Sequence, residues 1–533
     1  MRLPIHKSFF SPVHIYPYHL FSLSIRRMST RTYNQAIDCL NTLQSNAATL
    51  EASRASGGKL VHTAIPETIE YLQRIGYKPE DLNALNVIHI TGTKGKGSTC
   101  AFTDSILRHV KPDWKVGLYT SPHLVAVRER IRINGAPLSE EAFAKYFFDV
   151  WDRLEANDTR ANPETLPKPM YFRFVTLVAY HAFLSLKVDA TILEVGVGGT
   201  FDCTNIVPKP IVTGISALGI DHTAVLGKTI EEIAWQKGGI YKPDVPALTV
   251  NQPEEGLRVL RERATELKAS EFIVAPFIPG LTDIKLGLHG VHQYQNANLA
   301  VHLARRFLRA KSSSPNTDFE TETLPESFIK GLQEAKWPGR CQEVVDPKHP
   351  DTLWLLDGAH TKESLECCMQ WFVSPDIALR DTGDSTPMRI LIFNCTSGRS
   401  GNAFLGSMLS NAAIQLKLHG QGNVDALKLF DSVIFCANVT YADGGFKGDL
   451  TTKAISDSDL AALKTQNDLA SAWLELNPQF PKNNVHVLPS IEHAVNIVRD
   501  QEKQHGKIDV LVAGSLHLVG GVIEVAGLSE VAL

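Results

Sequence analysis

A glycine-rich turn that carries two lysines occupies residues 92–98, with the sequence Gly-Thr-Lys-Gly-Lys-Gly-Ser. The apolar run 86–90 before it predicts a buried strand, and the apolar spacing after it predicts a helix over 99–110. In such a turn the missing Cβ atoms let backbone N–H groups surround an anion, and the helix N-terminus adds partial positive charge. We therefore predict a nucleotide site in which Lys96 reaches the terminal phosphates and the Ser98 hydroxyl lies near phosphate or metal.

The spacing of this turn differs from the common nucleotide-loop pattern. Two residues separate Gly92 from Gly95, and Gly97 follows the lysine. A purely structural glycine-rich turn is therefore the alternative. The order of strand, turn and helix favours the phosphate site.

Glu194 ends a predicted strand, and Ser121 and His222 each follow the C-terminal end of another. Open α/β sheets bind their ligands at this edge. Alone, each residue is more often a turn residue, a solvated acid or a structural histidine. A hydroxyl, a carboxylate and an imidazole suffice for a Mg²⁺ ion that keeps several waters and bridges phosphates. Because the three converge on one edge, we predict that they hold magnesium.

Short apolar runs alternate with helical stretches after residue 30, which is typical of mostly parallel sheets covered by helices on both faces. The predicted strands cover 86–90, 115–119, 190–194, 211–216 and 246–250, and then 353–356, 389–393, 432–436, 485–488 and 509–513. The polar segments 155–168 and 311–326 are predicted to be exposed loops.

The predicted fold class is α/β with two domains. We expect a P-loop ATPase domain with a mostly parallel sheet over 31–340, and a smaller C-terminal α/β, Rossmann-like domain over 341–533. A tail over 1–30 precedes them.

Composition excludes several classes of protein. A chain of 533 residues with 44% hydrophobic residues can bury two or more cores. A formal net charge of −4 gives no general attraction to nucleic acid, and no apolar run reaches membrane-spanning length. The eight cysteines are scattered without a Cys-x-x-Cys pair, which favours a reduced compartment. We expect no nucleic-acid partner and no integral membrane segment.

The N-terminal segment is basic and contains no acidic residue before Asp38. Its arginines and lysines are interleaved with serines and apolar residues, which is typical of a mitochondrial presequence. Met28 offers a second start that would remove most of this segment. We therefore expect two locations, the mitochondrial matrix with its inner-membrane surface and the cytoplasm. The alternative is a tail without a targeting role.

Taken together, these motifs resemble folylpolyglutamate synthase, a relative of the Mur peptide ligases, over about residues 30 to 533. The resemblance is carried by residues 92–98, Ser121-Pro122-His123-Leu124, Glu194-Val195-Gly196, Asp221-His222, Lys237, Pro338-Gly339-Arg340 and Asp357-Gly358-Ala359-His360. Tyr171-Phe172-Arg173-Phe174 and the segment 514–521 resemble the eukaryotic, especially fungal, members.

The resemblance implies ATP-dependent addition of L-glutamate to the γ-carboxylate of tetrahydrofolate or a folylpolyglutamate, through an acyl phosphate. A carboxylate is a poor acylating agent because its leaving group would be oxide, and phosphorylation supplies a better one. Water must be kept from the intermediate, so closure of one domain on the other is expected. The implied cofactors are ATP and Mg²⁺, with a monovalent cation such as K⁺, and we expect a monomer.

The resemblance also assigns roles to residues. It places at ATP the residues Gly95, Lys96, Gly97, Ser98, Gln293, Asn296, Arg340 and Asp357. It places at magnesium the residues Ser121, Glu194 and His222. It gives catalytic roles to Lys96, Lys237 and His360. For Gln293, Asn296 and His360 a helix-capping or structural polar role is the alternative.

Lys237 matches a family position where the lysine can be carbamylated, which turns a cation into a carboxylate-like group. An unmodified ammonium beside Mg²⁺ would repel it, so the modification makes electrostatic sense. Gln236 and Gly238 depart from the more usual glutamate and alanine. A plain lysine that contacts phosphate or carboxylate is the other interpretation.

Two other functions use the same features. Dihydrofolate synthesis joins glutamate to dihydropteroate with the same machinery, but relatives with that activity tend to carry glutamate where Arg173 stands. A regulatory ATP-binding protein would keep the fold without ligation. The retained Ser121, Glu194 and His222 argue against a mere binder, which has little need of a whole metal set.

Overall fold

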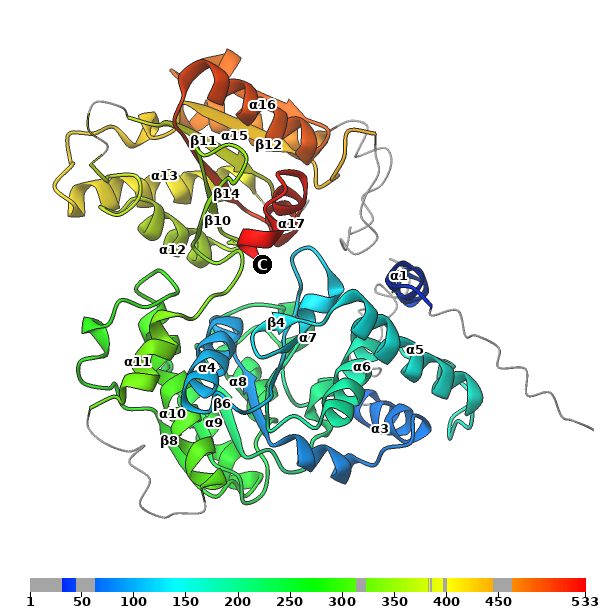
Figure 1. Ribbon diagram of the computed structural model, residues 1–533. Helices are drawn as coiled ribbons and strands as arrows, with labels where there is room; N and C mark the ends of the chain where they lie inside the picture. Colours follow the sequence, from blue (N-terminus) through cyan, green and yellow to red (C-terminus); the bar gives the residue numbers. More distant parts are fainter. Residues whose placement is uncertain are drawn as a thin grey trace, which may run out of the picture.

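The computed structural model describes residues 31–44, 63–312, 323–381, 383, 386–395, 400–443 and 463–533. Within these ranges the chain forms two β-sheets, each covered by helices (Figure 1). This mixed α/β fold with two largely parallel sheets confirms the predicted class. The predicted targeting segment 1–30 lies outside the described residues.

The first sheet has eight strands in the order β4-β3-β2-β5-β1-β6-β7-β8. The strands are β1 Val87–Thr91, β2 Val116–Tyr119, β3 Ile131–Ile133, β4 Ala136–Pro137, β5 Ala190–Glu194, β6 Val212–Ile215, β7 Ala247–Thr249 and β8 Phe272–Val274. All neighbours pair in parallel except β2 with β3 and β3 with β4. Since β5 and β6 flank β1 on opposite sides, the carboxyl end of β1 is a topological switch point, where such sheets bind ligands.

Helices cover both faces of this sheet. They are α1 Tyr33–Asn41, α3 Ala64–Arg74, α4 Lys96–Val110, α5 Glu140–Ala156, α6 Tyr171–Leu186, α7 Thr223–Leu226, α8 Ile230–Gly238, α9 Glu254–Glu266, α10 Gln293–Lys311 and α11 Glu326–Gln333. Alternate residues of β1 face opposite ways, as the strand pleat requires. Val87 packs in the cluster of α1, α3, α5 and α6, whereas Ile88 packs in that of α4, α10 and α11.

The second sheet has the order β13-β12-β11-β14-β10-β9, and only β9 is antiparallel to its neighbour. Its strands are β9 Gln342–Val345, β10 Thr352–Leu356, β11 Met388–Phe393, β12 Ser432–Cys436, β13 Val485–Leu488 and β14 Ile508–Ala513. Its helices are α12 Lys362–Phe372, α13 Gly401–Leu418, α15 Lys464–Leu476, α16 Ile491–His505, α17 Leu516–Val525 and α18 Ser529–Ala532. One face packs α12, α13 and α15, and the other packs α16 and α17.

Short 3-10 helices complete the described elements: η1 Pro79–Leu85, η2 Val127–Arg130, η3 Cys203–Ile206, η4 Leu281–Asp283, η5 Ala426–Lys428 and η6 Lys482–Asn484. Within the ranges given above, none of the helices combines the length and the apolar character that a membrane crossing needs.

The loop after β2 belongs to the domain of the first sheet and packs against the domain of the second sheet. Leu124 and Val125 are buried in the hydrophobic cluster of the second sheet, together with residues of α17. The C-terminus lies between the two domains (Figure 1), where Gln342 donates to the Ala532 carbonyl at 2.9 Å. The first domain therefore inserts apolar side chains into the core of the second.

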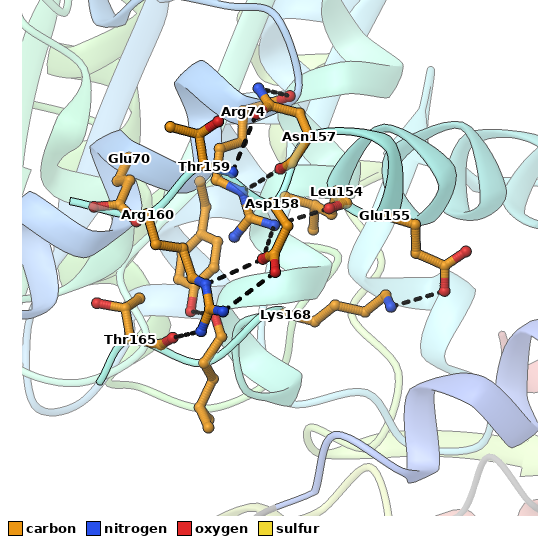
Figure 2. Close-up of polar contacts among 12 residues, drawn as sticks. Glu70, Arg74, Leu154, Glu155, Asn157, Asp158, Thr159, Arg160, Thr165 and Lys168 are labelled. Atoms are coloured by element: carbon orange, nitrogen blue, oxygen red, sulfur yellow. Dashed lines mark hydrogen bonds and ion pairs between the residues drawn. The ribbon is translucent and has the colours of Figure 1, made fainter. Parts of the chain in front are cut away.

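The connection between α5 and α6 is held by buried arginine contacts (Figure 2). Arg74 is buried, and it donates to the Leu154 carbonyl at 2.8 Å and the Asn157 carbonyl at 2.6 Å, at the end of α5. Asp158 accepts from both Arg74 and Arg160. This segment was predicted to be a loop from residue 155, but α5 continues to Ala156.

The ten predicted strands are confirmed to within about a residue at each end. Four strands were missed, namely β3, β4, β8 and β9, all of which are short. The helix predicted over 99–110 begins three residues earlier, because Gly95 adopts a left-handed φ of 84° and starts the helix directly from the turn. Residues 313–322 of the loop predicted over 311–326 lie outside the described residues. The first residue of that predicted loop ends α10, and the last begins α11.

Candidate active site

A cavity of about 630 Å³ lies where the strands around β1 end, and residues of both domains line it. The structure brings together here the predicted residues Gly95, Lys96, Gly97, Ser98, Ser121, Glu194, His222, Gln293, Asn296, Arg340, Asp357 and His360. Lys237 lies behind the glycine-rich turn, where it is buried. The residues that the sequence assigned to nucleotide, metal and catalysis therefore share one site.

The glycine-rich turn fits its neighbours closely. At Gly95, φ is 84°, and a Cβ there would lie 2.0 Å from Asn296 Oδ1. A Cβ at Gly97 would lie 2.9 Å from Trp337 Nε1. A side chain at either position would collide with these groups, and at Gly95 the left-handed φ also favours glycine.

Lys237, which is buried, and Lys96, which is half-buried, converge on one backbone carbonyl of the turn. The Nζ atoms of Lys96 and Lys237 donate to the Gly92 carbonyl at 3.0 Å and 2.8 Å. Burial lowers the pKa of Lys96, and burial together with the Lys96 charge lowers the pKa of Lys237 well below its usual value. An anion bound in the turn would stabilise both charged forms.

Glu194 lies at the end of β5, paired in register with Ile90 of β1. Its Oε2 accepts from the Ser121 backbone N–H at 2.8 Å. Burial raises the pKa of Glu194, and the nearby Lys96 charge opposes that shift. A buried carboxylate in this setting gains from a neighbouring cation.

His222 lines the same cavity with φ at 49°, and its backbone N–H donates to Asp221 at 2.8 Å. Burial lowers the pKa of the His222 imidazole, which favours the neutral form that binds metals. Within the described residues no group of three or more His, Cys, Asp and Glu side chains is arranged to hold a metal. A metal held by Ser121, Glu194 and His222 would thus need phosphate or water oxygens as further ligands.

The second domain contributes the other wall. Asp357 accepts from the backbone N–H groups of Cys341 and Ala359, each at 2.7 Å. His360 Nδ1 donates to the Gly358 carbonyl at 2.8 Å, which fixes the protonated ring nitrogen. Lys94 of the turn donates to Thr361 across the domain boundary at 3.2 Å.

Gln293 and Asn296 lie in the first turn of α10 and are both buried. Asn296 Nδ2 donates to Gln293 Oε1 at 2.9 Å. This bond supports the structural role that the sequence left open, and their place in the cavity wall supports contact with a nucleotide.

The sequence missed several residues of this cavity. Trp337 lines the cavity and lies against Gly97, three residues before the last residue of the predicted first domain. Arg130 and Phe172 also line the cavity. The sequence does carry a sign of Arg130, because the segment 128–132 is unusually rich in charged residues and closely follows Ser121 of the predicted magnesium site.

Comparison with family models gave no match. The chain is 44% identical over 524 residues to folylpolyglutamate synthase of Saccharomyces cerevisiae strain AWRI796, covering 96% of this chain and 90% of the relative. The protein of strain YJM789 matches with the same identity and coverage.

Among solved structures, Mycobacterium tuberculosis folylpolyglutamate synthase complexed with ADP superimposes with a TM-score of 0.62 at 21% identity, covering 93% of this chain and 98% of that one. E. coli FolC in complex with ADP, without folate substrate, gives a TM-score of 0.62 at 22% identity, covering 94% and 98%. These two likenesses show the shared two-domain fold. From its 44% identity to the yeast enzymes over nearly its whole length, the chain belongs to the folylpolyglutamate synthase family.

Proposed function

We propose that this protein is the ligase that joins L-glutamate to the γ-carboxylate of tetrahydrofolate and its polyglutamates, with ATP as the energy source. One observation carries the proposal: a glycine-rich phosphate turn, a buried carboxylate and second-domain residues line a single cavity at the switch point of the sheet. The yeast relatives carry the name of this activity over almost the same length.

The chemistry needs two displacements. A γ-carboxylate oxygen of the folate attacks the γ-phosphorus of ATP, the bond from that phosphorus to the bridging oxygen breaks, and ADP leaves. The glutamate amine then attacks the acyl carbon, loses a proton, and phosphate leaves as the amide forms. Lys96, which belongs to the turn, is placed to neutralise charge on the transferred phosphoryl group.

Magnesium and a monovalent cation such as K⁺ are part of the proposal. The residues present fit magnesium, since a hydroxyl, a buried carboxylate and a neutral imidazole line one cavity. Ser121, Glu194 and His222 would hold the ion, which would supply positive charge at the phosphates. Turnover with EDTA, and with Na⁺ in place of K⁺, tests the two ions separately.

Purified protein with ATP, Mg²⁺, tetrahydrofolate and labelled glutamate tests the function. We expect ADP release that depends on glutamate and on tetrahydrofolate, with the label recovered in a folate one residue longer. Strict dependence on dihydropteroate would instead indicate dihydrofolate synthesis. Protein that binds ATP but releases no ADP with either compound would indicate a non-catalytic binder.

We also propose two locations, mitochondrial and cytoplasmic, from starts at Met1 and Met28. The acid-free basic composition before Asp38 supports this proposal. Fluorescent fusions whose first or second start codon has been removed would test it. We expect the product that starts at Met28 to stay in the cytoplasm.

We further infer that the protein is a monomer, because one chain supplies both walls of the cavity. Analytical sedimentation measures the oligomeric state directly.

A further inference from the structure

Arg130 is a buried cation in the wall of the active-site cavity to which neither the phosphate site nor the metal site gives a role. It ends η2, directly before β3, and its residue is 6% exposed. Its Nε donates to His123 Nδ1 at 2.8 Å, and its guanidinium lies over the Tyr171 ring, 5.4 Å from the centroid. These two contacts fix the plane of the guanidinium and leave its two Nη nitrogens for other partners.

No carboxylate of the described residues forms an ion pair with Arg130, and its Nη nitrogens have no hydrogen-bond partner there. The other carboxylates that line the cavity nearby already accept hydrogen bonds from backbone N–H or hydroxyl groups. Glu129 accepts from three successive backbone N–H groups, those of residues 124–126, and Glu194 accepts from Ser121. Asp202 accepts from Thr204 and Val197.

Arg132, two residues later, shows the contrast. Its Nε and Nη1 atoms donate to the carbonyls of Glu129, Gly135 and Leu533, whereas Arg130 makes one such bond. A buried cation without an anion is costly. The two Nη nitrogens of Arg130, which have no partner among the described residues, therefore indicate an anionic ligand. The forked geometry of a guanidinium suits a carboxylate.

The surroundings of Arg130 indicate which anion. The glycine-rich turn and its lysines already provide for the phosphates of ATP. Arg130 instead lies beside the start of α6, where Tyr171 contacts it and Phe172 lines the cavity. Its charge also acts on Glu194, so it lies near the reacting region. A cation next to an aromatic wall suits an aromatic compound that carries a carboxylate.

We propose that Arg130 binds the α-carboxylate of the terminal glutamyl residue of the folate substrate, and so turns the γ-carboxylate of that residue toward the phosphate turn. The inference rests on the proposed function and deepens it. His123 acts as a positioning residue, because its ring nitrogen orients the guanidinium.

The test compares Arg130→Ala and Arg130→Lys with Arg128→Ala as a matched control. Arg128 lies in the same segment, is half-buried outside the cavity, and donates to the Leu138 carbonyl. The two substrates are tetrahydrofolate and tetrahydropteroyl-γ-aminobutyrate, which keeps the γ-carboxylate and lacks the α-carboxylate. Steady-state kinetics give KM for each substrate, for ATP and for glutamate.

We expect Arg130→Ala to raise KM for tetrahydrofolate at least about tenfold, as loss of hydrogen bonds to a charged group implies. Wild-type protein should show a similar rise for the γ-aminobutyrate analogue, and Arg130→Ala should no longer distinguish the two substrates. KM for ATP should stay unchanged in every variant. Arg130→Lys, which keeps the charge but loses the fork, should fall between wild type and alanine, and it carries the test if the alanine variant does not fold.

A rise in KM for glutamate instead of tetrahydrofolate would overturn the assignment, and so would continued discrimination between the two substrates by Arg130→Ala. A fall in kcat alone would also overturn it. Inactive wild-type protein would count against the proposed function, whereas active wild type with an unaffected Arg130→Ala counts only against this inference.

Discussion

The Gly92 carbonyl accepts hydrogen bonds from two lysines, which is unusual for one neutral oxygen. Lys237 is buried, Lys96 is half-buried, and both have a lowered pKa. The carbonyl carries only a partial charge, so it compensates two adjacent cations poorly. A bound phosphate would compensate them better, and this electrostatic imbalance is the reason why the turn should bind a highly charged anion.

Replacing Lys96 by alanine should reduce kcat/KM at least about 100-fold, because charge on the transferred phosphoryl group would lose its neutralising partner. Glu194→Gln should have a comparable effect through loss of a metal ligand. Both variants should keep the circular dichroism spectrum of wild type. Lys111→Ala, at the far end of α4, serves as the control and should keep full activity. Near-native turnover in either active-site variant would contradict the assigned role.

His89 in the middle of β1 predicts how stability depends on pH. It is fully buried, its Nε2 contacts Thr204 at 3.0 Å, and burial lowers its pKa from 6.5 to about 3. Between these values the unfolded chain binds a proton that the folded chain does not, so stability falls as pH falls below 6.5. The slope approaches about 1.4 kcal/mol per pH unit.

Urea unfolding at pH 7 and pH 5 checks this expectation. His89→Gln should lose less free energy of unfolding than wild type over that interval, whatever its stability at pH 7. His419→Gln, an exposed histidine at the end of α13, should follow wild type. Parallel pH dependence in all three proteins would show that His89 does not control acid stability.

At the scale of elements, Arg74 connects α3 to the end of α5 (Figure 2). Its guanidinium satisfies helix-end carbonyls that would otherwise be buried without donors. Arg74→Ala should lower the free energy of unfolding by about 2–4 kcal/mol. Lys168→Ala removes the ion pair with the exposed Glu155 and should cost about 1 kcal/mol or less. Equal losses in the two variants, measured by urea unfolding, would contradict the capping role.

The sequence predicted the elements that bury long apolar runs and missed those that do not. β1, β5 and β14 are buried along their whole length, so composition alone indicates them. β3 has only three residues, carries Arg132 at its centre and pairs antiparallel with β2, so it contains no long apolar run. Short edge strands depend on their neighbours more than on their own side chains.

The same distinction applies to the site. Ser121, Glu194 and His222 could be placed on one edge because each follows a buried strand of one parallel sheet. Arg130 could not be assigned a ligand, because its role depends on which neighbouring acids are occupied by backbone N–H groups. Which carboxylates accept hydrogen bonds from backbone N–H groups depends on how the loops fold, and the residue types alone do not reveal it.

At the scale of the whole molecule, the site exists only while the two domains stay together, since Asp357 and His360 of the second domain line the same cavity as the turn. The contact that holds them includes Leu124, which packs in the second domain's cluster. Gly520 in α17 lies directly against it, because a Cβ at Gly520 would lie 2.0 Å from the Leu124 carbonyl oxygen.

Gly520→Ala therefore sets two effects against each other. Within a helix, alanine is favoured over glycine by about 1 kcal/mol, so a free helix would gain stability. At this interface the added methyl group must push the Leu124 backbone away, and a displacement of about 1 Å can cost about 100-fold in rate. We expect lower turnover and a larger radius of gyration in solution scattering, with unchanged helix content. Gly422→Ala, whose Cβ would meet nothing closer than 3.9 Å, should change neither quantity. If Gly520→Ala kept native turnover and dimensions, the packing of Leu124 against α17 would not be what aligns the two halves of the site.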